Sequence, residues 1–313
     1  LRTTTVNPDV LEGWGVRNSD WQFGVSVQQE LAPQVALQVA YNRRSWSNFF
    51  TTHNRALTPA DYETVTLTAP QHPLLIDGGG YPVTFLTRNT RSALGATDSY
   101  YTTNSDFGDE THYWHGVDIA FNARLRNGLV LQAGTSTGRG VNDTCEVETA
   151  IYGRPQVRIG DDQTPACDVA EPWLTNLRGL ATYTVPKVDV LVSTIFRSQP
   201  NAQPGTGVAT NGSSRPATYR MTAAQFLAAT GVALRPGLAT QDVNILLPGS
   251  LYGDRVNAVD MRFSKIVRFG ARRANIGLDL YNMLNANTPT NYETLYDPAT
   301  NGARWMRPTG VMA

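Results

Sequence analysis

Apolar and polar residues alternate one by one along several stretches of the chain. In the first of these, Trp21, Phe23, Val25 and Val27 are separated by polar or small residues. Successive side chains of a β-strand point to opposite faces, so this period of two predicts strands with one apolar face. A helical pattern occurs only near 219–234, where we expect a short helix within a loop. The same alternation recurs at 35–42, 115–122 and 276–281.

The connections between the expected strands are of two kinds. Short ones contain Pro, Asn-Gly or Gly, which is typical of tight hairpin turns. Long ones run for about 15 residues or more, which is uncommon in compact soluble domains. Short and long connections alternate, so in an antiparallel sheet all the long ones would lie at the same end. The short connections are 32–34, 126–128, 185–187 and 270–272, and the long ones are 51–111, 138–172, 198–254 and 285–303.

Long two-faced strands with short turns at one end and long loops at the other are typical of a transmembrane β-barrel. We therefore predict an all-β fold, the antiparallel wall of a transmembrane barrel, with about eight or nine strands in this chain. A sheet in lipid must close, because every backbone group needs a partner there. A soluble β-sandwich with one solvated face is the alternative. Aromatic residues near the strand ends would form an interfacial girdle: Trp21, Tyr41, Trp46, Tyr113, Trp114, Trp173 and Tyr183.

The charge composition bears on which kinds of partner the protein can bind. The 313 residues include 26 Lys+Arg and 26 Asp+Glu, so the formal net charge is zero. No basic excess is present to neutralise phosphates, which argues against a nucleic-acid partner. The short basic pairs Arg43-Arg44, Arg272-Arg273 and Arg304/Arg307 fit either lipid headgroup contact or solvated turns.

Two groups of motifs carry a family resemblance. The first runs from Gly13-Trp14-Gly15 to Tyr41-Asn42-Arg43-Arg44. The second includes Tyr252-Gly253-Asp254-Arg255 and Asp279-Leu280-Tyr281-Asn282-Met283-Leu284-Asn285. Together they resemble the C-terminal barrel of TonB-dependent outer-membrane receptors, in particular the group with an N-terminal carboxypeptidase-regulatory-like domain.

The resemblance implies a function. Residues 1–313 would be a partial outer-membrane barrel domain, with the N-terminal plug, the early strands and the closing strand outside it; Trp305 and Pro308 look like the start of the closing strand. The protein would bind a small-molecule or oligomeric nutrient and import it across a Gram-negative outer membrane. An inner-membrane energy-coupling protein would drive this import through the missing N-terminal region. A passive porin-like or adhesion barrel and a secreted glycan-binding or glycan-acting β-protein remain alternatives.

The chain offers little that indicates catalysis. No catalytic or phosphate-loop motif appears, so we expect no enzyme activity and no cofactor. His112 and His115 lie three apart on a strand and would face opposite sides, which disfavours one shared metal ion. Ligand capture is assigned to an aromatic-rich loop that contains Tyr81, Phe85, Tyr100 and Tyr101.

Two sets of residues complete the predictions. Cys145 and Cys167 lie in one long connection, separated by 22 positions, and we predict a disulfide there because such loops pass through an oxidising compartment. The lipid-facing set is predicted from the alternation: Phe23, Val25, Leu37, Val39, Val117, Ile119, Phe121, Leu278 and Leu280.

Overall fold

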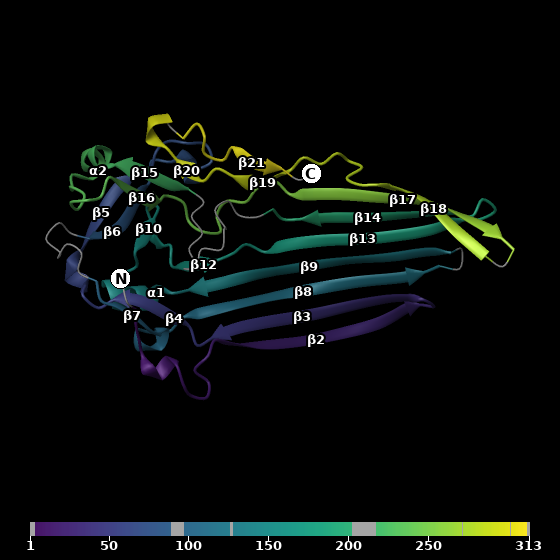
Figure 1. The fold of residues 1–313 in the computed structure, drawn as a ribbon, viewed down its shortest axis with the longest axis horizontal. Helices are drawn as coiled ribbons and strands as arrows, with labels where there is room; N and C mark the ends of the chain where they lie inside the picture. The colour runs from purple at the N-terminus through teal and green to yellow at the C-terminus, as the bar shows by residue number, and fades with distance from the viewer. Residues whose placement is uncertain are drawn as a thin grey trace.

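Eight long antiparallel strands form one continuous sheet, which we call the wall (Figure 1). The computed structural model describes residues 4–88, 97–125, 128–201, 217–270, 272–300 and 302–311. Each wall strand pairs with the next along the path, and a short strand, β12 (Asp168–Ala170), pairs with β9 off this path. In order across the sheet the wall strands are β2 (Ser19–Ala32), β3 (Val35–Ser47), β8 (Thr111–Arg124), β9 (Leu129–Asp143), β13 (Leu174–Val185), β14 (Val190–Gln199), β17 (Val256–Phe269) and β18 (Arg272–Leu280).

The all-β, antiparallel prediction is confirmed, and so are the four hairpins. Gln34 and Lys187 adopt positive φ values of 65° and 71° in two of the turns. Three residues of the predicted turns, Arg126, Asn127 and Ala271, lie outside the described residues. The hairpin turns gather at one end of the wall and the long connections at the other (Figure 1).

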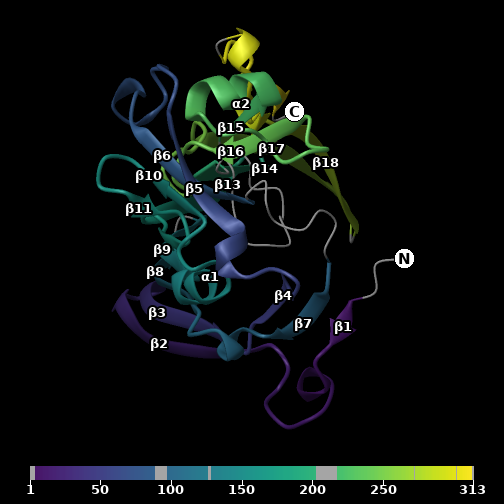
Figure 2. The ribbon, with the colours of Figure 1, turned by 90° about the vertical axis from the view of Figure 1, so that its left-hand side faces the viewer.

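The wall is curved rather than flat. Viewed from the end that carries the long connections, it forms an arc with β2 and β18 at its two ends (Figure 2). Among the described residues these two edge strands have one neighbour each and do not pair with each other. No helix in the described part of the chain is long and apolar enough to cross a membrane.

The end of the chain departs from the sequence-based prediction. The last long strand ends at Leu280, because Asn282 and Asn285 take positive φ values of 48° and 49° and turn the chain. The Asn282 backbone N–H donates to the Asp260 carboxylate over 2.8 Å. Trp305 does not begin a wall strand; it is buried, and a short strand, β21 (Pro308–Val311), pairs instead with β19 (Pro289–Tyr292).

The long connections are folded rather than open. Two small sheets and one helix, which we call the cap, lie at the end of the wall opposite the hairpins (Figure 1). The cap comprises β5 (Tyr62–Thr68), β6 (Pro82–Arg88), β10 (Val157–Ile159), β11 (Thr164–Pro165), β15 (Thr218–Thr222), α2 (Ala223–Thr230), β16 (Thr240–Asn244) and β20 (Leu295–Tyr296). Beside it lie a third sheet, β1 (Thr5–Val6), β7 (Ser99–Thr103) and β4 (Phe50–Asn54), and the helix α1 (Cys145–Tyr152).

The main hydrophobic core of the described residues belongs to the cap and not to the wall. The predicted helix near 219–234 is confirmed as α2, which begins with a capping box between Thr222 and Gln225 and buries Phe226 completely. The wall, by contrast, leaves its large apolar side chains on the surface. The core cluster is Val65, Leu67, Ala69, Leu75, Tyr81, Val83, Phe85, Ile159, Ala217, Met221, Phe226, Val243, Ile245, Leu246, Tyr296 and Trp305.

Candidate functional site

The wall has one apolar and one polar face, and the strand register assigns each residue to one of them. Val27 lies opposite Val39, and Val39 lies opposite Ile119, so all three share the apolar face. Large side chains here are open to the surroundings; Phe23 is 61% exposed and Leu278 is 60% exposed. The same register places all nine residues of the predicted lipid-facing set on this face: Phe23, Val25, Leu37, Val39, Val117, Ile119, Phe121, Leu278 and Leu280.

Hydrogen bonds and ion pairs cross the polar face from strand to strand. Asn42 donates to Asp118 over 2.6 Å, and Arg44 pairs with Asp20 over 2.9 Å. Small residues beside Asn42 and Asp118 leave a hollow of about 470 Å³. The polar face therefore offers a hydrogen-bonding surface.

The polar face is richest in chemistry where the wall reaches the connections. Here two neighbouring rows of residues, each paired across adjacent strands, run across β8, β9 and the segment that contains β12 and the following Glu171. In one row His112 lies opposite Asn142, and in the next Trp114 lies opposite Gly140. The Gly140 backbone N–H donates to the Glu171 carboxylate over 3.2 Å, while the Glu171 N–H donates to the Gly140 carbonyl over 2.9 Å.

A loop residue, Tyr252, lies close enough to Glu171 for the two groups to interact electrostatically. A side chain added at Gly249 in the same loop would lie 3.8 Å from the Glu171 Cα, so the loop passes over β12. Burial, helped by the Glu171 charge, raises the pKa of Tyr252 to about 12. We call His112, Trp114, Asn142, Glu171 and Tyr252 the junction site.

Two oxygens of the junction site are buried without a hydrogen-bond partner among the described residues. They are the Asn142 Oδ1 and the Tyr252 hydroxyl. A buried polar atom without a partner costs roughly 1–3 kcal/mol, so these two atoms need a partner that the described residues do not supply. A ligand with hydroxyl or amide groups, or ordered water, would satisfy them.

Stacked rings flank the same site. The His112 ring stacks on Trp46 at a centroid distance of 4.3 Å, and Phe49 lies 6.2 Å from His112. His115 lies on the apolar face among other rings, 5.0 Å from Trp173. The two histidines thus belong to separate clusters, and the described residues hold no group of three metal-ligating side chains. The junction site combines flat aromatic surfaces with hydrogen-bonding groups, which suits ligand binding.

The structure separates the four residues that the sequence assigned to ligand capture. Tyr81 and Phe85 are 7% and 3% exposed and belong to the cap core. The Tyr81 hydroxyl donates to the Ile245 carbonyl over 2.5 Å. Tyr100 and Tyr101 are half-buried in a different sheet, on β7. The sequence did not distinguish rings that build a core from rings that contact a ligand, and it missed the junction site.

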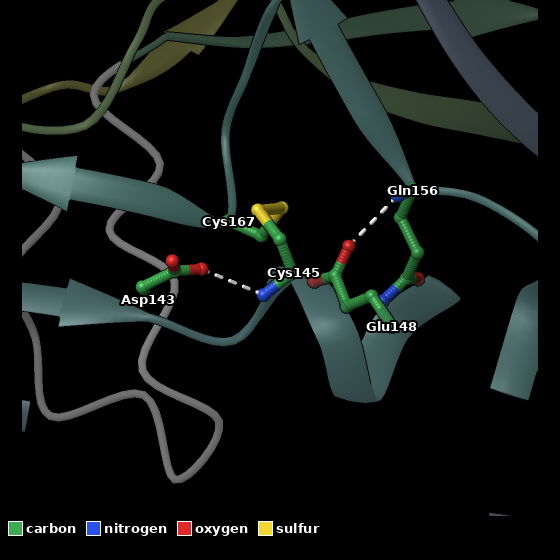
Figure 3. The surroundings of a disulfide bond; sticks show 5 residues. All are labelled: Asp143, Cys145, Glu148, Gln156 and Cys167. Atoms are coloured by element: carbon green, nitrogen blue, oxygen red, sulfur yellow. Dashed lines mark hydrogen bonds between the residues drawn. A yellow bond between two sulfur atoms is a disulfide. The ribbon is translucent and has the colours of Figure 1, made fainter. Parts of the chain in front are cut away.

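Cys145 and Cys167 are joined in a disulfide, with Cα atoms 5.1 Å apart (Figure 3). The bond lies just beyond the ladder in which Asp168 pairs with Asp143, so it closes the end of the β9–β12 pair. Asp143 accepts from the Cys145 N–H over 2.9 Å at the start of α1. On α1, Glu148 accepts from the Gln156 N–H over 2.7 Å, and burial raises the pKa of Glu148 (Figure 3).

Comparison with known proteins finds no matching family model, no matching curated protein and no matching solved structure.

Proposed function

We propose that the chain is the partial barrel domain of a TonB-dependent outer-membrane receptor in a Gram-negative bacterium. It binds a polar nutrient, a small molecule or an oligomer, at the junction site and passes it through the lumen. An inner-membrane energy-coupling protein drives the translocation through a region outside the 313 residues. The mechanism is binding and gated passage, with no bond made or broken.

One observation carries this proposal: the two faces of the wall and its two ends differ in the way a transporter needs. An exposed apolar face suits contact with hydrocarbon, while the polar face suits contact with water and solute. The connections at one end fold into a cap with its own core. Where that end meets the polar face, the junction site offers the Asn142 and Tyr252 oxygens, which have no hydrogen-bond partner among the described residues, and the His112–Trp46 stack.

Uptake by cells that produce the full-length protein tests the proposal. Cells are offered labelled polar solutes, such as oligosaccharides and peptides, at low concentration. We expect at least one solute to accumulate, and accumulation to stop when an uncoupler collapses the proton gradient. Uptake that continues without the gradient would support a passive porin, and binding at the cell surface without uptake would support an adhesin.

A matched pair of variants locates the site. Asn142→Ala removes a junction-site group, whereas Asn122→Ala removes the same group from the polar face nearer the hairpin end, where Asn122 lies opposite Gln132. We expect solute binding to weaken roughly tenfold in Asn142→Ala, the usual effect of one lost ligand hydrogen bond, and to stay unchanged in Asn122→Ala. Equal affinities in both variants would place ligand binding elsewhere.

A further inference from the structure

Two arginines on the apolar face have no carboxylate partner among the described residues. Arg43 lies opposite His115, and His115 lies opposite Arg139, so the three form one row across β3, β8 and β9. Six ion pairs occur in the described part of the chain, and neither of these arginines takes part in one. Arg44 follows Arg43 directly, yet it lies on the polar face and pairs with Asp20.

Both guanidinium groups form few hydrogen bonds with the described residues. Arg43 donates weakly to the Ser45 hydroxyl over 3.4 Å and lies 4.4 Å above the centre of the Tyr113 ring. The Arg139 Nε is buried and has no hydrogen-bond partner among the described residues. On the same face of β9, Asp143 is four residues from Arg139, about 13 Å along the strand. An anion is therefore the partner that this row lacks.

Aromatic rings surround the row. His115 lies 5.0 Å from Trp173, 5.7 Å from Tyr113 and 6.3 Å from Tyr41. Trp21, on the same face, is 81% exposed. Rings of this kind gather at the level of lipid headgroups in membrane proteins. Trp46 and Trp114, which the sequence also assigned to a girdle, lie on the polar face instead.

On the side toward the hairpins, the row borders further rows of the same face that contain mainly apolar residues. The neighbouring row toward the hairpins contains Val25, Tyr41 and Val117, and the following one contains Val27, Val39 and Ile119. Arg43 and Arg139 are two strands apart, about 10 Å, so both guanidinium forks can reach one group placed over His115. A molecule held there would have an anionic head at the row and apolar chains over the valines.

We propose that Arg43 and Arg139 bind the phosphate of an anionic membrane-lipid headgroup at the cap-side edge of the apolar face. Arginine suits phosphate because its planar fork donates two parallel hydrogen bonds. The rings of Tyr113 and Trp173 flank the headgroup, and the acyl chains lie along the apolar surface. This site rests on the proposed membrane placement of the apolar face.

Lipid retention by the purified full-length protein tests the site. The protein is exchanged into a neutral detergent that contains phosphatidylglycerol or phosphatidylcholine, and bound lipid is counted by native mass spectrometry. We expect the unmodified protein to retain phosphatidylglycerol selectively. The double variant R43Q/R139Q should lose at least about tenfold in affinity, as expected when charge-assisted hydrogen bonds are removed. The matched control R44Q, from the same Arg-Arg pair, should retain the lipid.

Four outcomes would overturn the site. Equal retention by R43Q/R139Q and the unmodified protein would show that the arginines do not hold the lipid. Displacement of the lipid by millimolar inorganic phosphate would identify a site for small anions instead. Insertion into detergent with no preference for anionic lipid would remove the site alone, whereas a protein that stays monodisperse in water without detergent would remove the proposed function as well.

Discussion

The position of the Trp114 ring depends on two neighbouring glycines, which have no side chain to occupy the same space. Its indole lies on the polar face over Gly116 and Gly138, which are opposite each other in the register of β8 and β9. A Cβ at Gly116 would lie 2.6 Å from the ring Cη2, and a Cβ at Gly138 would overlap the ring. Glycine weakens a strand by itself, so these two positions are explained by the ring that covers them and by backbone oxygens. A Cβ would lie 2.7 Å from the Thr137 carbonyl at Gly116 and 2.9 Å from the His115 carbonyl at Gly138.

Gly138→Ala should therefore destabilise the protein by roughly 1–3 kcal/mol, the usual cost of forcing extra volume into a filled space. Gly179→Ala is the control, because a Cβ there would meet nothing closer than 3.9 Å. Urea unfolding of the full-length protein in detergent measures both. In a Trp114→Ala background the cost of Gly138→Ala should become smaller but should not vanish, because a Cβ at Gly138 would still lie 2.9 Å from the His115 carbonyl oxygen. Equal costs for the two glycines would contradict this role of Trp114.

Glu148 gives a prediction that depends on pH. Burial raises its pKa above 4.5 in the folded state, because the charged form is the one that desolvation penalises. The stability that this group contributes is fully present below pH 4.5 and is lost as the pH rises through the folded-state pKa. Glu148→Gln keeps an acceptor for the Gln156 N–H and removes the buried charge.

The variant should therefore be more stable than the parent at pH 7, and the difference should shrink toward pH 4. Hydrogen exchange of the α1 amides across this pH range measures the local stability. Glu146→Gln is a poor control, since Glu146 accepts from the Asp109 N–H, whereas Glu12→Gln changes an exposed carboxylate. A difference between Glu148→Gln and the parent that does not change with pH would count against this reading.

At the scale of elements, the wall could be predicted from sequence, whereas in the cap only the helix α2 could. Period-two alternation and hairpin residues such as Pro33 are local signals, so the long strands and their turns followed from them. The cap strands span two to seven residues and pair across long separations; β6, for example, pairs with β10 about 75 positions later. Such segments are too short to show a period of two in the sequence. The sequence pattern therefore placed Tyr81 and Phe85 in a loop rather than in a core.

The junction site escaped prediction for a related reason. Its residues come from β8, β9, the end of β12 and a loop beyond position 248. The register that brings Glu171 beside Gly140 depends on a three-residue strand, which the sequence pattern does not predict. What the sequence did supply was the separation of His112 from His115, because the alternation of faces along a strand is fixed by backbone geometry.

The disulfide makes a prediction about one element. In the chain-entropy model a bond that closes about 22 residues is worth roughly 3 kcal/mol. The bond connects the start of α1 to the strand β12, so its loss should loosen these two and leave the wall intact. Cys145→Ser/Cys167→Ser should speed hydrogen exchange in residues 144–171 by roughly a hundredfold, as a loss of this size implies, while exchange in β13 and β14 stays unchanged. Loosening of the wall strands would contradict this division.

A second element-scale prediction concerns the apolar face. Ile119 lies near the middle of β8 on that face, and its neighbour Ala120 lies on the polar face. If the apolar face contacts hydrocarbon, Ile119→Arg should destabilise the inserted protein by roughly 2–4 kcal/mol. Ala120→Arg should cost much less, since its charge would enter a hydrated space. Similar costs for the two, measured by unfolding from lipid vesicles, would contradict a lipid-facing role.

At the scale of the whole molecule, the two edge strands of the wall, β2 and β18, determine the conditions under which it is stable. Every residue of β2 and of β18 is exposed. Each of these strands has a neighbour on one side only in the described part of the chain, so the other side presents unpaired N–H and C=O groups. In hydrocarbon each unpaired group costs several kcal/mol, which no apolar side chain nearby can offset. In water the same edges would pair with other copies of the chain.

Residues 1–313 alone should therefore fail to form a monodisperse inserted barrel. If the chain is one part of a larger barrel, as we propose, the full-length protein should form one, because further strands would pair with β2 and β18. Refolding each into detergent micelles, followed by size-exclusion chromatography and electrophoresis with and without boiling, measures the difference. The full-length protein should run as a protease-resistant monomer whose mobility changes on boiling, and the 313-residue chain should run as mixed oligomers. If the 313-residue chain alone gave such a heat-modifiable monomer, its edges would have to meet each other, and the proposal that it is one part of a larger barrel would be wrong.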